Sequence, residues 1–113
     1  MGGNDQMKNI KLIEDVQDYV KKISDRNGWN LNVNQDILFA LINGLRDNFN
    51  RLGYYNCPCR DSQEDPQVDR DIICPCRYAN ADIVEYGHCY CALYFTPEYD
   101  QSKPLRMIPE RRP

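Results

Sequence analysis

The sequence contains no cysteine before residue 57 and none after residue 91, so all six of its cysteines lie within one short stretch. It also lacks any hydrophobic run that approaches the roughly 20 apolar residues of a transmembrane helix. We therefore expect no membrane partner. Histidine and tryptophan are scarce, with one residue of each. Charged residues are abundant at 27% of the chain, which is typical of a soluble globular protein.

The N-terminal residues lack the features of a targeting segment. They show neither the apolar stretch of a secretory signal peptide nor the Arg- and Ser-rich, acid-poor composition of a transit peptide. Residue 6 is Gln rather than Ser or Thr, so the pattern for myristoylation at Gly2 is not met. We therefore expect a cytoplasmic location. In that reducing compartment, thiols are more often metal ligands or redox groups than structural disulfides.

Charge is distributed unevenly along the chain. The net charge is −3, but residues 57–100 carry nine acidic and three basic side chains, whereas residues 101–113 carry one acidic and four basic ones. The acidic middle segment would repel nucleic acid. We therefore expect no nucleic-acid partner.

Two amphipathic helices are predicted in the first half of the chain. Apolar residues recur at steps of three and four over residues 9–25, and Gly28 is expected to end this first helix. A second apolar stripe predicts a helix over residues 34–52, with Asn34 as its N-cap. Gly44 lies inside the second helix and suggests a close crossing of the two helices.

The second half has weaker signals of regular structure. Residues 60–73 are rich in acidic residues and predict a solvated loop, with one helical turn near residues 68–72. A short helix capped by Asn80 is predicted over residues 80–86. The apolar segment 92–95 is expected to be buried.

The cysteines form three Cys-X-Cys pairs. They are Cys57-Pro58-Cys59, Cys74-Pro75-Cys76 and Cys89-Tyr90-Cys91. Two cysteines separated by one residue make a strained disulfide with each other. We therefore expect each pair to send its two sulfurs to different places.

Three interpretations of the six cysteines remain open at this point. A disulfide framework is disfavoured by the expected reducing compartment. A zinc site usually draws on pairs spaced Cys-X2-Cys to Cys-X4-Cys, and its four ligands would leave two cysteines over. A [4Fe-4S] cluster also takes four cysteines, but the two that remain can then sit beside it as a redox-active disulfide.

The motifs resemble a known family. The Cys-Pro-Cys-Arg sequence at 57–60, the Cys-Pro-Cys sequence at 74–76 and the Cys-Tyr-Cys-Ala-Leu-Tyr-Phe-Thr-Pro sequence at 89–97 look like the catalytic subunit of ferredoxin:thioredoxin reductase. The agreement extends upstream to residues 43–45 and 52–53. The resemblance implies a mainly α fold, a small single domain of short helices and loops wrapped around a [4Fe-4S] cluster.

Four parts of this single catalytic domain, 1–113, are expected. They are a flexible N-terminus (1–8), two supporting helices (9–56), the cluster and disulfide region (57–97) and a basic tail (98–113).

The resemblance also assigns roles to the six cysteines. It implies four cluster ligands, which are Cys57, Cys74, Cys76 and Cys89. The other two, Cys59 and Cys91, would form the redox-active disulfide. Cys59 would be the outer sulfur that exchanges with thioredoxin, and Cys91 would be the inner sulfur that resolves the mixed disulfide.

One residue departs from the family pattern. The third motif of the family is usually Cys-His-Cys, with the histidine as a proton relay, but position 90 here is Tyr. The single histidine, His88, immediately precedes Cys89. Because imidazole titrates near neutral pH, we hypothesise that His88 reaches the Cys59 and Cys91 pair and supplies a proton.

Function and partners follow from the same resemblance. We expect an iron-sulfur disulfide reductase that takes single electrons from a ferredoxin-like donor and reduces thioredoxin or a thioredoxin-like protein, with a second, variable subunit as a possible companion. The alternatives are a zinc-stabilised binding module without catalysis and a plain electron carrier. Ferredoxins are acidic, so a basic docking surface is expected. Its candidates are Arg60, Arg77, Lys103, Arg106, Arg111 and Arg112.

Overall fold

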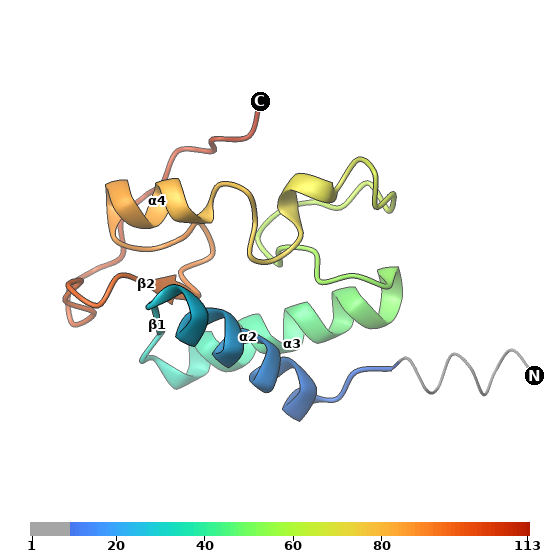
Figure 1. The fold of residues 1–113 in the computed structure, drawn as a ribbon, viewed down its shortest axis with the longest axis horizontal. Coiled ribbons are helices and arrows are strands. Elements are labelled where there is room, and N and C mark those ends of the chain that lie inside the picture. Colours follow the sequence, from blue (N-terminus) through green and yellow to red (C-terminus); the bar gives the residue numbers. More distant parts are fainter. Residues whose placement is uncertain (1–9) are drawn as a thin grey trace, which may run out of the picture.

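Helices carry most of the regular structure in the computed structural model, which describes residues 10–113 (Figure 1). They are α2 (Ile13–Asn27), α3 (Gln35–Leu52) and α4 (Ala79–Tyr86), together with a 3-10 turn, η1 (Arg70–Ile72). Two short strands, β1 (Asn30–Leu31) and β2 (Tyr94–Phe95), form an antiparallel pair. The predicted mainly α fold of short helices and loops is confirmed. None of the helices within residues 10–113 has the length and hydrophobicity needed to cross a membrane.

Helix α2 is amphipathic, as predicted. Its apolar face buries three side chains about one turn apart, those of Val16, Val20 and Ile23. The helix begins at Ile13, later than predicted, because the Asp15 carboxylate accepts a hydrogen bond of 2.8 Å from the Leu12 backbone N–H and fixes the first turn there. Gly28 ends the helix in a left-handed conformation with φ of 71°. The flexible N-terminus predicted for residues 1–8 lies outside the described residues.

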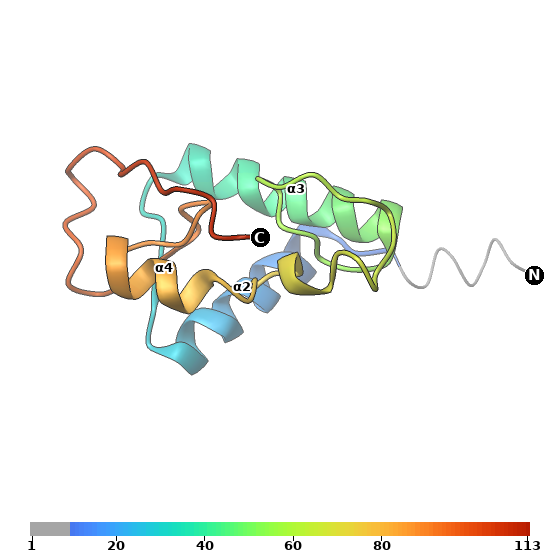
Figure 2. The same ribbon diagram turned by 90° about the horizontal axis from the view of Figure 1, so that it is seen from above.

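Helix α3 packs beside α2 and has the boundaries that the sequence predicts (Figure 2). The Asn34 side chain caps it by accepting hydrogen bonds from the backbone N–H groups of Asp36 at 3.0 Å and Ile37 at 3.1 Å. Its buried face consists of Leu41, Ile42 and Leu45. These residues join the same hydrophobic core as the buried face of α2 and as four of the cysteines.

Gly44 brings α3 close to the first Cys-Pro-Cys pair. A Cβ atom at Gly44 would lie 2.9 Å from Cβ of Pro58, which is closer than side-chain carbons can approach without displacement. The prediction that Gly44 marks a crossing of the two helices is therefore wrong, because its close neighbour is Pro58. The missing side chain lets the turn that carries Cys57 and Cys59 pack directly on the helix.

We expect Gly44→Ala to destabilise the protein. Alanine would favour an isolated helix by about 1 kcal/mol, but here its methyl group would overlap the rigid Pro58 ring and displace the turn. Thermal unfolding should show a lower melting temperature than wild type. Asp47→Ala, at an exposed position of the same helix, should change it little. A Gly44→Ala protein as stable as wild type would contradict this account of the contact.

The two-residue strands anchor the third cysteine pair to the helical half of the molecule. Asn30 pairs with Phe95 and Leu31 with Tyr94. The Asn32 side chain adds a buried hydrogen bond of 2.9 Å to the carbonyl of Ala92. Residues 92–95 are buried, as predicted. The strands themselves were not predicted, because two residues are too few to show a period-two pattern.

The acidic loop between the first two pairs is more ordered than its composition predicts. Asp69 is fully buried, and its carboxylate accepts hydrogen bonds from the hydroxyls of Tyr54 and Ser62 and from the Gln63 N–H. These hydrogen bonds keep the pKa of Asp69 below its usual range, although burial acts in the opposite direction. The prediction that the acids of this loop form only a solvated surface is therefore wrong for Asp69.

The two remaining helical predictions agree with the structure in large part. The turn predicted near residues 68–72 is present as η1. Helix α4 is also present and ends at Gly87, but it begins at Ala79. The predicted N-cap, Asn80, is wrong, because Tyr78 occupies that position.

The C-terminal tail folds back over the acidic half of the chain (Figures 1 and 2). Arg111 forms ion pairs with Asp82 at 2.8 Å and Glu85 at 2.6 Å on α4. Arg112 forms an ion pair with Asp71 of η1 at 2.9 Å. The basic tail therefore pairs with three of the acidic residues of the middle segment, although the sequence shows the two as separate charge blocks.

Candidate cysteine site

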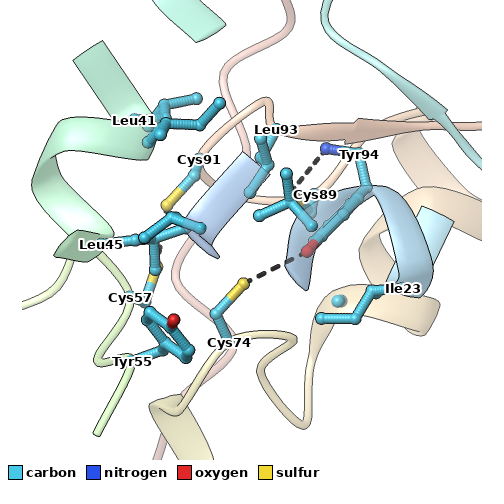
Figure 3. Packing of buried hydrophobic residues seen from close by; sticks show 14 of the residues in the cluster. Ile23, Leu41, Leu45, Tyr55, Cys57, Cys74, Cys89, Cys91, Leu93 and Tyr94 are labelled. Carbon is cyan, nitrogen blue, oxygen red and sulfur yellow. Dashed lines mark hydrogen bonds between the residues drawn. The ribbon is translucent and has the colours of Figure 1, made fainter. Parts of the chain in front are cut away.

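Five of the six cysteines line one cavity with a volume of about 20 Å³. The five are Cys57, Cys74, Cys76, Cys89 and Cys91. Four of them are buried in the core, where Figure 3 shows them among the side chains of Leu45, Leu93 and Tyr94. Cys76 is half-buried, and Cys59 is exposed. All six are free thiols.

Backbone hydrogen bonds join the first pair to the second. The N–H of Cys57 donates to the carbonyl of Ile72 at 2.8 Å, and the N–H of Cys74 donates to the carbonyl of Tyr55 at 2.7 Å. An isolated β-bridge between Asn56 and Ile73 lies between these two bonds. The segments that enter the two Cys-Pro-Cys turns are thus held side by side, although they are far apart in the sequence.

Cys91 lies next to both cysteines of the first pair. Its Sγ is 2.8 Å from Sγ of Cys57, and it is within hydrogen-bonding reach of Cys59. The hydrogen bond from Cys91 lowers the pKa of Cys57 to about 7 and also lowers the pKa of Cys59. The same two contacts, with Cys57 and Cys59, raise the pKa of Cys91. Cys59 and Cys91 are therefore neighbours, and the disulfide between them stays a prediction.

Cys74 and Cys89 lie at the buried end of the cavity, against Tyr94 (Figure 3). The Tyr94 hydroxyl is 3.5 Å from Sγ of Cys74, and the Tyr94 N–H donates to Sγ of Cys89 at 3.4 Å. Burial raises the pKa of both thiols, to about 11 for Cys89 and further for Cys74. Without a positive group bound to them, these two sulfurs are therefore held in their neutral form.

Arg60 brings a positive charge to the opening of the cavity. Its Nη1 donates to Sγ of Cys76 at 3.3 Å and to Sγ of Cys57 at 3.8 Å. Its Nε and Nη2 each donate to a carboxylate oxygen of Glu110 at 2.8 Å. Burial alone would lower the pKa of Arg60, but the hydrogen bond that it donates to Glu110 and the nearby Cys76 and Cys57 sulfurs more than offset burial and raise the pKa.

Sequence reasoning did not assign Arg60 and Tyr94 to the site. The sequence predicts Arg60 only as a docking residue, although it directly follows a Cys-Pro-Cys pair. Tyr94 lies three residues after Cys91 in a segment that was predicted only to be buried. Arg60 contacts Cys76 and Tyr94 contacts Cys74, which are distant in the sequence. Such contacts leave no local sequence pattern, so the sequence does not predict that either residue belongs to the site.

His88 points away from the thiols that it was predicted to reach. Its Nδ1 is 2.8 Å from the backbone carbonyl of Cys89, and its Nε2 accepts a hydrogen bond of 3.3 Å from the Arg106 N–H. The ring is buried between Phe95 and Tyr99. The structure therefore does not bring His88 to Cys59 and Cys91, since both ring nitrogens are occupied by backbone groups. A catalytic role for His88 stays a prediction without a contact that supports it.

The residues around the cavity fit an iron-sulfur cluster by their chemistry. All four predicted ligands, Cys57, Cys74, Cys76 and Cys89, line the same cavity, and cysteine thiolate is the ligand that such clusters use. The Arg60 side chain and the Tyr94 N–H donate hydrogen bonds to these sulfurs, as is common around bound clusters. Within residues 10–113, no three cysteine, histidine or carboxylate side chains converge closely enough to surround a single metal ion.

The candidate docking residues do not form one exposed basic surface. The Arg60 side chain is only 3% exposed, so its proposed part in docking is wrong. Arg111 and Arg112 are engaged in ion pairs with acidic residues of the same chain. Arg77, Lys103 and Arg106 are exposed, and they stay candidates for contact with an acidic partner.

Comparisons with known proteins agree with the resemblance seen in the motifs. The profile of the family described as ferredoxin thioredoxin reductase catalytic beta chain matches residues 6–109. The chain is also 27% identical over 92 residues to the chloroplastic ferredoxin-thioredoxin reductase catalytic chain of Spinacia oleracea. That match covers 80% of this chain and 60% of the relative. The relative is named chloroplastic, and the cytoplasmic location expected here stays a prediction.

Proposed function

Because the chain belongs to the ferredoxin thioredoxin reductase catalytic beta chain family, we propose that it is an iron-sulfur disulfide reductase. It takes single electrons from a ferredoxin-like donor and delivers them in pairs to the disulfide of thioredoxin or a thioredoxin-like protein. The observation that carries the proposal is the arrangement of the six sulfurs. Five line one cavity, and the sixth, Cys59, lies at the surface next to Cys91.

Four of these sulfurs would hold a [4Fe-4S] cluster, with Cys57, Cys74, Cys76 and Cys89 as its ligands. The cluster would supply the Cys59 and Cys91 pair with one electron at a time. Most of the residues that line the cavity are apolar or cysteine, and Arg60 places a positive charge against the sulfurs of Cys57 and Cys76. The designation of the family as a beta chain supports a companion subunit.

The exchange with the partner uses Cys59 and Cys91 in turn. The Cys59 thiolate attacks one sulfur of the partner disulfide, forms a mixed disulfide and releases the other partner sulfur as a thiol after it takes a proton. Cys91 then gives up its proton while its sulfur attacks Sγ of Cys59, which closes the Cys59–Cys91 disulfide and releases the second partner sulfur, with a proton, as a thiol. Two electrons and two protons therefore pass to the partner, and two electrons from the donor with two protons from solvent restore the Cys59 and Cys91 thiols.

Exposure supports this division of labour between the two sulfurs. Cys59 is exposed and has a lowered pKa, so it is both accessible and ionised more readily than an ordinary thiol. Cys91 is 9% exposed, so a partner protein reaches it far less readily than Cys59, and its raised pKa makes it a weaker nucleophile at neutral pH. Its proximity to Cys59 lets it act on the mixed disulfide from inside.

A trapping experiment tests this order of attack. We expect reduced Cys91→Ser protein, mixed with oxidised thioredoxin, to accumulate a mixed disulfide through Cys59, because the resolving sulfur is missing. Mass spectrometry of the intact adduct and of its peptides identifies the bond. Cys59→Ser should yield no adduct under the same conditions. An adduct that forms equally in both variants, or in neither, would contradict the proposed roles.

A further inference from the structure

Arg60 connects all three cysteine pairs and the C-terminal tail. It directly follows the first pair, and its Nη1 donates to Cys57 of that pair and to Cys76 of the second. Its guanidinium lies over the ring of Tyr90, the middle residue of the third pair, with Cζ 4.3 Å from the ring centroid. Glu110 of the tail accepts hydrogen bonds from Nε and Nη2 of Arg60.

Burying this charge requires compensation from its surroundings. A guanidinium that is 3% exposed has lost nearly all contact with water, and such a loss is tolerated only where ion pairs and hydrogen bonds replace it. The bidentate pair with Glu110 supplies part of that replacement. The two sulfurs supply the rest, and they do so better as thiolates than as neutral thiols.

The tail is built to hold Glu110 in this position. Residues 110–112 contact three different parts of the molecule. Glu110 binds Arg60, Arg111 binds Asp82 and Glu85 of α4, and Arg112 binds Asp71 and the carbonyl of Val68. Because three consecutive residues bind three different parts of the molecule, the tail cannot shift along the chain without breaking all three contacts.

We propose that Arg60 stabilises negative charge on the sulfurs of Cys57 and Cys76, and that Glu110 is the positioning residue that holds it there. The C-terminal tail is thereby part of the cysteine site. This inference rests on the proposed function, because both sulfurs are proposed cluster ligands. Hydrogen bonds and positive charge at ligand sulfurs raise the reduction potential of a cluster, since the reduced state is the more negative one.

The sequence provides a matched control for this proposal. Both Cys-Pro-Cys motifs are followed by arginine, but Arg77 after the second motif is exposed whereas Arg60 is buried on the sulfurs. Arg60→Gln and Arg77→Gln therefore remove the same charge from the same position of equivalent motifs. Only Arg60→Gln removes a contact to the sulfurs.

The midpoint potential of the iron-loaded protein is the measurement. We expect Arg60→Gln to lower the equilibrium constant for one-electron reduction about tenfold, which corresponds to about 59 mV for a one-electron couple. Glu110→Gln should shift the potential in the same direction but less, because Arg60 keeps its charge and loses its fixed position. Arg60→Lys should restore part of the shift, since the charge returns without the planar geometry. Arg77→Gln should leave the potential near that of wild type.

The outcomes separate this proposal from the function on which it rests. If wild type binds iron and sulfide but Arg60→Gln and Arg77→Gln have the same potential, the role of Arg60 is overturned while the proposed function stands. If Arg60→Gln fails to fold, the comparison of Glu110→Gln with Arg77→Gln decides, and equal potentials overturn the proposal. If wild type itself binds no cluster, both the function and this inference fall.

Discussion

Cys74→Ser is expected to yield a folded protein that has lost most of its iron. Cys74 is one of the buried cysteines among the proposed ligands, and its sulfur lines the cavity beside the Tyr94 hydroxyl. A serine hydroxyl fits this space and can hydrogen-bond to Tyr94, but it is a poor ligand for iron that prefers soft thiolates. We expect iron to fall from about four atoms per chain, as in a [4Fe-4S] cluster, to nearly none.

The control for this variant is Cys59→Ser, which should keep the iron content and the visible absorption of wild type. Circular dichroism of both variants would establish that the helices are formed. If Cys74→Ser bound as much iron as wild type, or if Cys59→Ser lost it equally, the assignment of ligands would be contradicted.

Cys59→Ser is expected to abolish disulfide reduction without removing the cluster. Cys59 is the exposed thiol of the six and the one that a partner protein can approach. The loss of a covalent nucleophile typically lowers a rate by at least about three orders of magnitude. The rate of thioredoxin reduction, driven by chemically reduced ferredoxin under anaerobic conditions, is the quantity to compare.

Gln63→Ala provides a matched control in the same loop, because its side chain is exposed and its backbone N–H still donates to Asp69. That variant should retain nearly full activity. Residual reduction by Cys59→Ser at a substantial fraction of the wild-type rate would show that another group attacks the partner disulfide, and the proposed order of exchange would then be wrong.

The parts of the fold that the sequence predicts are those with local causes. Helix α3 follows from an apolar stripe, an Asn34 cap and a terminal glycine, all of which act within a few residues. The burial of residues 92–95 follows from composition alone. Helix α2 is present but begins at Ile13 rather than near residue 9, because its first turn depends on a hydrogen bond from the Leu12 N–H to Asp15 that periodicity does not reveal.

The parts that the sequence did not predict depend on contacts between distant segments. The glycine at position 44 predicts a close approach but not its partner, which is Pro58 rather than the other helix. The tail shows only a basic composition, and its folding back depends on Asp71, Asp82 and Glu85 in another segment. Similarly, His88 directly precedes Cys89 in the sequence, but its ring packs against Tyr99 and accepts a hydrogen bond from the Arg106 N–H.

The cysteine site lies between these two cases. The spacing of the three pairs and the resemblance that they carry identified all six sulfurs, and the structure brings five of them to one cavity with the sixth beside it. The spacing of the cysteines does not reveal which other side chains surround the sulfurs. Arg60 and Tyr94 reach the cavity, and Glu110 reaches Arg60, only because the chain has folded.

The most direct test of the account is a count of reactive thiols combined with iron and sulfide analysis on protein purified without oxygen. The account predicts about four iron and four sulfide per chain, with Cys59 and Cys91 alone becoming alkylated after reduction and protected after oxidation. The other four cysteines should resist alkylation in both states. A colourless protein that contains zinc or no metal, or one in which a cysteine pair other than Cys59 and Cys91 changes with reductant, would contradict it.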